Sequence, residues 1–176
     1  MLYRKKQAKK IERAGLRVLY ECNEELRRAA CKAGRKTGTT ATIILLYERR
    51  YYLWHIGDTR AYRIRKRTAA KKERNIRIHP LTRDHTAYEH VLVRCIGSFP
   101  WKQPDVSHGY LRKGETILLC SDGFRNRVEE DRLGEAMQTG EILSKDDLRM
   151  RLQEIAKYVK SKGEADNISA VAVRML

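Results

Sequence analysis

The feature that most constrains the fold is a change in hydrophobic period between Gly34 and Gly38. Before it, apolar residues recur at spacings of three and four, which is typical of one amphipathic helix over residues 6–34. After it, short apolar runs alternate with turn residues, which predicts strands in consecutive hairpins. We expect strands at 39–47, 51–56, 60–65, 76–79, 106–111, 116–120 and 168–173, and later helices at about 127–138 and 145–161.

This order of elements indicates an α+β fold rather than a parallel sheet, because the strands follow one another in hairpins and the helices gather at the two ends of the chain. The sequence has no repeat and no low-complexity linker, so one domain over residues 1–176 is the simplest interpretation. No apolar run approaches the ~18–20 residues of a transmembrane helix. No apolar segment of signal-peptide length follows the basic N-terminus, which argues against a secretory signal.

The four cysteines, Cys22, Cys31, Cys95 and Cys120, form no C-x-x-C pair and no cluster with zinc-ligand spacing. Unpaired thiols of this kind are typical of a cytoplasmic protein. The net charge of +16 is concentrated in two basic blocks, at 1–37 and 60–83, the second of which includes a basic loop at 66–74. Such blocks attract nucleic acid or anionic lipid by charge alone, but no nucleic-acid-binding motif accompanies them. We therefore do not expect nucleic acid as the partner.

Two acidic turns are candidates for binding a hard divalent cation. Asp122 follows an apolar strand and precedes Gly123, and Asp166 with Asn167 enters the last strand. Mg²⁺ and Mn²⁺ prefer carboxylate oxygens held on rigid turns. Either Asp taken alone is more typical of a turn or helix cap.

Five motifs, in this order, resemble the signature of the metal-dependent, type-2C serine/threonine protein phosphatases. They are GTTATIILLYERRYYLWHIGDTRAYRIR (38–65), LTRDHT (81–86), RCIG (94–97), LLCSDGF (118–124) and ADNISAV (165–171). Each motif is weak alone, whereas the ordered set is specific, and residues 38–176 that carry it make up about four-fifths of the chain. The resemblance implies the family's layered α-β-β-α sandwich, in which helices flank two mainly antiparallel sheets.

The resemblance also implies hydrolysis of phosphoserine and phosphothreonine by a water that two Mn²⁺ or Mg²⁺ ions activate. By motif position, Asp122 and Asp166 correspond to metal ligands, while Gly123 and Asn167 support them. Asn126 stands where many members place an Asp for a third metal, and it lacks that charge. No residue is assigned as a catalytic acid or base.

Three further motif residues are interpreted as structural. Asp58 and Arg60 lie in a hairpin turn, and His85 lies in a loop. None of them is expected to bind metal.

The matched motifs cover only the back part of the family domain. The family's other ligands lie on an early strand and in an Asp-Gly-x-Gly-Gly turn, whereas this sequence has no Asp before Asp58 and no Glu followed by Gly in that stretch. We therefore expect a phosphatase domain truncated at its N-terminus, whether or not Met1 is the natural start. Its metal ligand set would be incomplete, and the chain alone would be weakly active or inactive.

Three functions follow from these observations. The first is a phosphatase for phosphoproteins of a kinase pathway, with its missing ligands supplied by a separately encoded N-terminal half or another copy of the chain. The second is a catalytically degenerate phosphatase fold, a pseudophosphatase, that regulates or binds a partner protein. The third, and least favoured, is a basic protein associated with nucleic acid.

Overall fold

The computed structural model describes residues 2–66, 76–88, 91–137, 142 and 144–176. Within that part, four helices and nine strands form two compact units. The first unit runs to Asp58 and resumes at Asp84–Tyr110, and the second comprises Thr59–Arg83 and Leu111–Leu176. The basic loop at 66–74 lies outside the described residues, apart from Lys66. None of the described helices combines the length and the apolar composition that crossing a bilayer requires.

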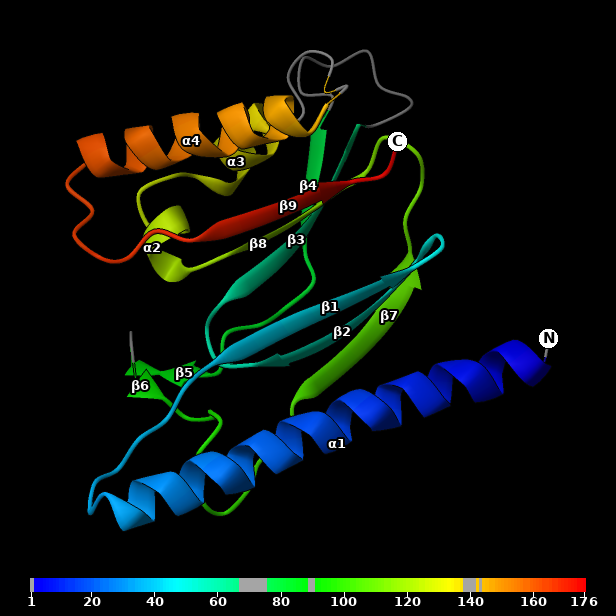
Figure 1. The fold of residues 1–176 in the computed structure, drawn as a ribbon. Helices are drawn as coiled ribbons and strands as arrows, with labels where there is room; N and C mark the ends of the chain where they lie inside the picture. The colour runs from blue at the N-terminus through cyan, green and yellow to red at the C-terminus, as the bar shows by residue number, and fades with distance from the viewer. Residues whose placement is uncertain (1, 67–75, 89–90, 138–141, 143) are drawn as a thin grey trace. The chain divides into compact units, whose positions relative to one another are not determined.

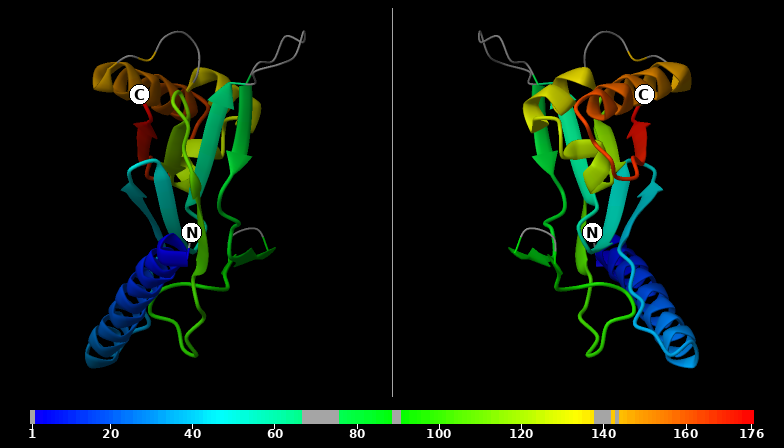
Figure 2. Two further views of the ribbon diagram at one scale, coloured as in Figure 1. Left: turned by 90° about the vertical axis from the view of Figure 1, so that its right-hand side faces the viewer. Right: turned by 90° about the vertical axis from the view of Figure 1, so that its left-hand side faces the viewer.

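The first unit consists mainly of one long helix and a three-stranded antiparallel sheet. The helix α1 (Leu2–Lys32) runs along the sheet, as Figures 1 and 2 show. The sheet has the order β1 (Ala41–Tyr47), β2 (Arg50–Ile56), β7 (Asp105–Tyr110). Trp54 on β2 is buried against α1, and its indole N–H donates to the carbonyl oxygen of Glu12 at 3.0 Å. A Cβ at Gly15 would overlap the Trp54 ring, so the close approach of helix and strand requires glycine there.

The segment before β7 carries two short strands, β5 (Thr86–Ala87) and β6 (Val91–Leu92), which pair with each other. Several hydrogen bonds tie it to the rest of the first unit. Buried Asn23 on α1 accepts the N–H of Gly97 at 2.7 Å, and Thr39 forms an isolated bridge with Ile96.

The second unit consists of a four-stranded antiparallel sheet covered on one face by helices (Figure 1). The strand order is β4 (Ile76–Pro80), β3 (Arg60–Lys66), β8 (Thr116–Cys120), β9 (Ala170–Arg174). The helices are α2 (Asp122–Arg125), α3 (Glu130–Ala136) and α4 (Lys145–Ser161). Ser144 caps α4 in a reciprocal pair of hydrogen bonds with Asp147.

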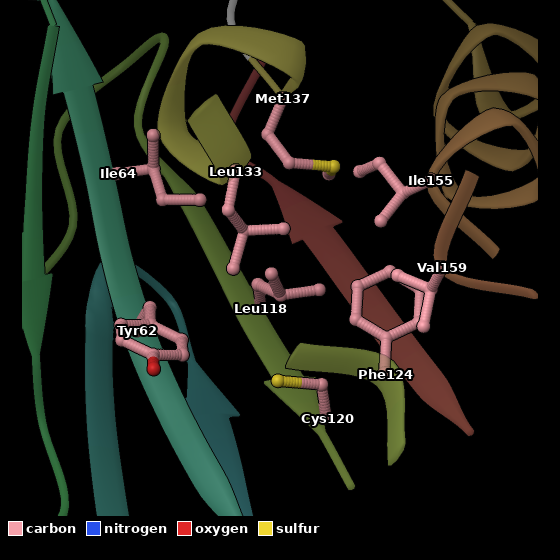
Figure 3. Packing of buried hydrophobic residues seen from close by; sticks show 9 residues of the cluster. All are labelled: Tyr62, Ile64, Leu118, Cys120, Phe124, Leu133, Met137, Ile155 and Val159. Carbon is pink, nitrogen blue, oxygen red and sulfur yellow. The ribbon is translucent and has the colours of Figure 1, made fainter. Parts of the chain in front are cut away.

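The core of the second unit lies between its sheet and its helices. The buried side chains that Figure 3 labels are Tyr62, Ile64, Leu118, Cys120, Phe124, Leu133, Met137, Ile155 and Val159. Because side chains alternate along a strand, Tyr62 and Ile64 enter this core while Arg63 and Arg65 lie on the other face of β3. Phe124 anchors the short helix α2 against the sheet.

The predicted fold class is confirmed: the chain is α+β, with antiparallel sheets and helices. The leading helix was expected over 6–34, and α1 spans Leu2–Lys32. The helix expected at 127–138 corresponds to α3 and is shorter, and position 138 lies outside the described residues. The two compact units leave the prediction of a single domain as a prediction.

Candidate metal site

Two loops that carry acidic residues meet beside the end of β8. Ser121, directly after β8, holds them together with three hydrogen bonds. Its N–H donates to the carbonyl oxygen of Ser169 at 3.0 Å, and its hydroxyl accepts the N–H of Ser169 at 3.1 Å. The same hydroxyl donates to the carbonyl oxygen of Asn167 at 3.1 Å. The turn at Asp122 is thereby fastened to the loop that carries Asp166.

Gly123 marks the closest approach of these loops. A Cβ at this position would lie 2.6 Å from the carbonyl oxygen of Asn167 and 3.3 Å from the Cβ of Asp166. Any side chain larger than hydrogen would therefore separate the loops. The structure thus brings together four of the residues that sequence motifs nominated, two from each loop.

The two carboxylates are oriented in the same way. Oδ1 of Asp122 accepts the N–H of Gly123 at 2.8 Å, and Oδ1 of Asp166 accepts the N–H of Asn167 at 2.7 Å. No described residue donates a hydrogen bond to the second carboxylate oxygen of either Asp. Asp122 is half-buried and Asp166 is exposed, so both are reachable from solvent.

This donor set suits one hard divalent cation better than two. Mg²⁺ commonly binds through one or two carboxylates and keeps several waters. In the described part of the chain, no three His, Cys, Asp or Glu side chains gather in a way that would hold a metal ion. A binuclear centre at Asp122 and Asp166 would therefore need further carboxylates from outside the described residues.

Glu164 is a site residue that the sequence motifs did not indicate. Its Oε1 accepts the N–H of Asp166 at 3.0 Å and that of Ala165 at 3.1 Å, and its Oε2 lies 3.6 Å from Nε of Arg127. It thereby fixes the loop that presents Asp166. The available signal was an acidic residue two positions before Asp166, a spacing at which side chains bind the backbone of a turn.

Two further residues border the site. Asn126 is exposed at the end of α2, and its backbone N–H donates to the carbonyl oxygen of Asp122 at 2.8 Å. Its side chain is a neutral amide. Burial raises the pKa of the Cys120 thiol to about 12, so this cysteine stays protonated at neutral pH and is unsuited to act as a nucleophile.

The motif residues interpreted as structural contact their own units. In the second unit, Nη1 of Arg60 lies 3.1 Å from Oε1 of Glu130, which links β3 to α3. In the first unit, Nδ1 of His85 accepts the N–H of Gly57 at 3.1 Å, and its Nε2 lies 3.1 Å from Oδ2 of Asp105. Asp58 is half-buried in the turn after β2.

Comparison with known proteins gives a consistent set of similarities. The family model described as Protein phosphatase 2C matches residues 3–160. Serine/threonine protein phosphatase PstP of Mycobacterium tuberculosis strain H37Rv is 30% identical over 144 residues, which are 76% of this chain and 27% of PstP. The chain therefore spans about a quarter of the length of that relative.

Solved structures also match. The serine/threonine phosphatase of S. agalactiae has a TM-score of 0.78 at 20% identity, covering 96% of this chain and 72% of that one. The catalytic domain of PstP in complex with two manganese ions has a TM-score of 0.64 at 26% identity, covering 88% of this chain and 67% of that one. The first of these similarities concerns the fold alone.

Proposed function

Because the chain belongs to the protein phosphatase 2C family, we propose that it is a metal-dependent phosphatase domain acting on phosphoserine and phosphothreonine in proteins. The observation that carries the proposal is the meeting of the Asp122 turn with the Asp166 loop through Ser121 and Gly123. The matched structure of PstP holds two manganese ions, which supports Mn²⁺ or Mg²⁺ as the cation.

In this proposal, Asp122 and Asp166 bind the cation, and the N–H groups of Gly123 and Asn167 orient their carboxylates. A divalent cation at this point supplies positive charge beside a phosphate and makes a nearby water more acidic. The two carboxylates carry a charge of −2, which balances one divalent cation. A pair of such cations about 4 Å apart repel each other strongly and need more carboxylate than this.

The remaining ligands would come from a separately encoded N-terminal half, from a further part of a longer protein or from a second copy. The edge of the first sheet is a candidate contact for that partner. Among the described strands β1 pairs only with β2, and its apolar side chains Ile43, Leu45 and Tyr47 are exposed. An unpaired apolar edge accepts a strand from another chain. Light scattering that shows a monomer, together with rapid amide exchange in β1, would contradict the binding of a partner strand at this edge.

The test of the proposed activity is hydrolysis of a phosphothreonine peptide by the 176-residue chain at millimolar Mn²⁺. We expect slow, Mn²⁺-dependent turnover that Asp122→Ala reduces to background. Asp146→Ala removes one exposed carboxylate at the start of α4 and serves as the matched control with unchanged turnover. Turnover that survives both a chelator and Asp122→Ala would refute the assignment.

A degenerate phosphatase fold that binds a partner without turnover is the second candidate. It is favoured by the finding that, across the described residues, no three metal-binding side chains gather. Absence of turnover at millimolar Mn²⁺ even when an N-terminal segment with the missing carboxylates is added would support it. An adjacent or frame-shifted upstream genomic segment that encodes an Asp-Gly-x-Gly-Gly turn would instead favour the enzyme.

A further inference from the structure

The strands β3 and β4 place four basic side chains on one face of the sheet in the second unit. Their antiparallel register sets His79 opposite Arg63 and Arg77 opposite Arg65. The alternate residues, such as Ile64, face the core instead. The four basic residues line an open hollow of about 200 Å³, which we call the basic hollow.

Positive charge in the basic hollow is only partly compensated. Glu115 is 4% exposed, and its Oε1 lies 2.8 Å from Nη2 of Arg63 while its Oε2 lies 3.0 Å from Nε of the same guanidinium. The positive charge of Arg65 also acts on Glu115 and helps to lower the pKa of that carboxyl, so Glu115 is shared by two of the arginines. The hollow with Glu115 therefore carries a net charge of +2 when His79 is neutral.

Arg65 and Arg77 are like charges set directly opposite each other on paired strands, which destabilises a sheet. A bound oxyanion removes that repulsion. The planar guanidinium of arginine binds two oxygens of a phosphate at once, so an opposed pair such as Arg65 and Arg77 suits a dianion.

The size of the basic hollow limits the ligand. Sites that enclose drug-sized molecules occupy roughly 300–1,000 Å³, so a hollow of about 200 Å³ suits a single phosphoryl group better than a whole nucleotide. None of the residues that line it belongs to the candidate metal site.

We propose that the basic hollow binds a phosphoryl group presented by a protein segment. Phosphate binding follows from these residues alone, whereas a protein as the source of the phosphate rests on the proposed function. The position of β4 favours a peptide over nucleic acid, because among the described strands β4 pairs only with β3. Its outer edge offers backbone groups to an extended peptide. A nucleic acid would instead bind through many phosphates along its length.

The test is binding of a fluorescent phosphothreonine peptide to the full chain in the presence of a chelator. The chelator prevents metal-dependent hydrolysis, so the result does not depend on the proposed activity. We expect the phosphopeptide to bind at least about tenfold more tightly than its threonine counterpart. The double variant Arg65→Gln, Arg77→Gln should lose about that factor. The double variant Arg65→Lys, Arg77→Lys should lose part of this affinity, because the positive charge is kept and the bidentate contact with phosphate is lost.

The matched control removes two exposed charges elsewhere, as Arg13→Gln with Arg35→Gln, and should bind within about twofold of the original chain. Equal binding of the two peptides, or unchanged binding by the Gln double variant, would overturn the proposal. If inorganic phosphate or single-stranded DNA binds the basic hollow as tightly as the phosphopeptide does, the claim that a protein presents the phosphoryl group is refuted. If circular dichroism shows that the double variant is unfolded, the single variant Arg77→Gln is tested instead. Its affinity for the phosphopeptide should fall about threefold or more.

Discussion

Replacing Gly123 by alanine should weaken both the fold and the candidate metal site. The new Cβ would lie 2.6 Å from the carbonyl oxygen of Asn167 and 3.3 Å from the Cβ of Asp166. The nearest atom belongs to the backbone of a loop that Ser121 holds in place, so it cannot rotate away. Overpacking of this kind typically costs about 1–3 kcal/mol.

The opposing effect is smaller. Alanine is favoured over glycine by up to about 1 kcal/mol inside a helix, but α2 has only four residues and realises little of that gain. We therefore expect Gly123→Ala to lower the free energy of unfolding by about 1–2 kcal/mol. Because the clash lies between the loops of Asp122 and Asp166, Mn²⁺ affinity should fall as well.

Gly134→Ala is the matched control, because it makes the same change within α3. There the new Cβ would lie 3.3 Å from the Cβ of Ile78, a side-chain contact that needs a shift of only tenths of an ångström. The helix gain of about 1 kcal/mol offsets this, so its stability should stay near that of the original chain. Urea unfolding followed by circular dichroism, and titration with Mn²⁺, give both readouts. If Gly123→Ala matched Gly134→Ala in stability and Mn²⁺ affinity, the close approach of the two loops at Gly123 would support neither the fold nor the metal site.

Further substitutions test the packing and charge of each unit. Burial alone would raise the pKa of Glu115, but the Arg63 guanidinium holds that pKa below its usual value. Ionised Glu115 therefore stabilises the fold at neutral pH. This contribution is lost as the pH falls through the folded-state pKa. Glu115→Gln should therefore cost about 1–3 kcal/mol at neutral pH and less in acid, as urea unfolding at several pH values would show. Gly15→Ala should displace Trp54 from α1, which changes tryptophan fluorescence and costs about 1–3 kcal/mol. Leu118→Ala should cost about 2–5 kcal/mol in thermal unfolding, since this side chain is fully buried.

The long helix and the hairpins could be predicted because their signals are local. The switch from a period of 3.6 to a period of 2 around Gly34–Gly38 separates α1 from β1 without any tertiary information. By contrast, α2, β5 and β6 have two to four residues each, too few for a hydrophobic period, and tertiary hydrogen bonds hold them. None of these three elements is therefore predicted from the sequence.

The candidate site could be predicted only in part. Motif positions nominated Asp122 and Asp166, but their proximity depends on the pairing of β8 with β9, in which Cys120 lies opposite Ala170. No local sequence pattern predicts the register of these two strands. Glu164 was missed because its role is to bind backbone N–H groups. The metal-binding role of the two Asp residues stays a prediction.

The most direct test of the central claim is Mn²⁺ binding by the full chain, measured by electron paramagnetic resonance of free Mn²⁺. We predict weak binding that disappears in Asp122→Ala and in Asp166→Ala and persists in the control Asp146→Ala. A shared dependence on both Asp residues is expected because they lie on two loops joined through Ser121 and Gly123. Mn²⁺ binding that is the same in all four proteins would contradict the assignment of this metal site.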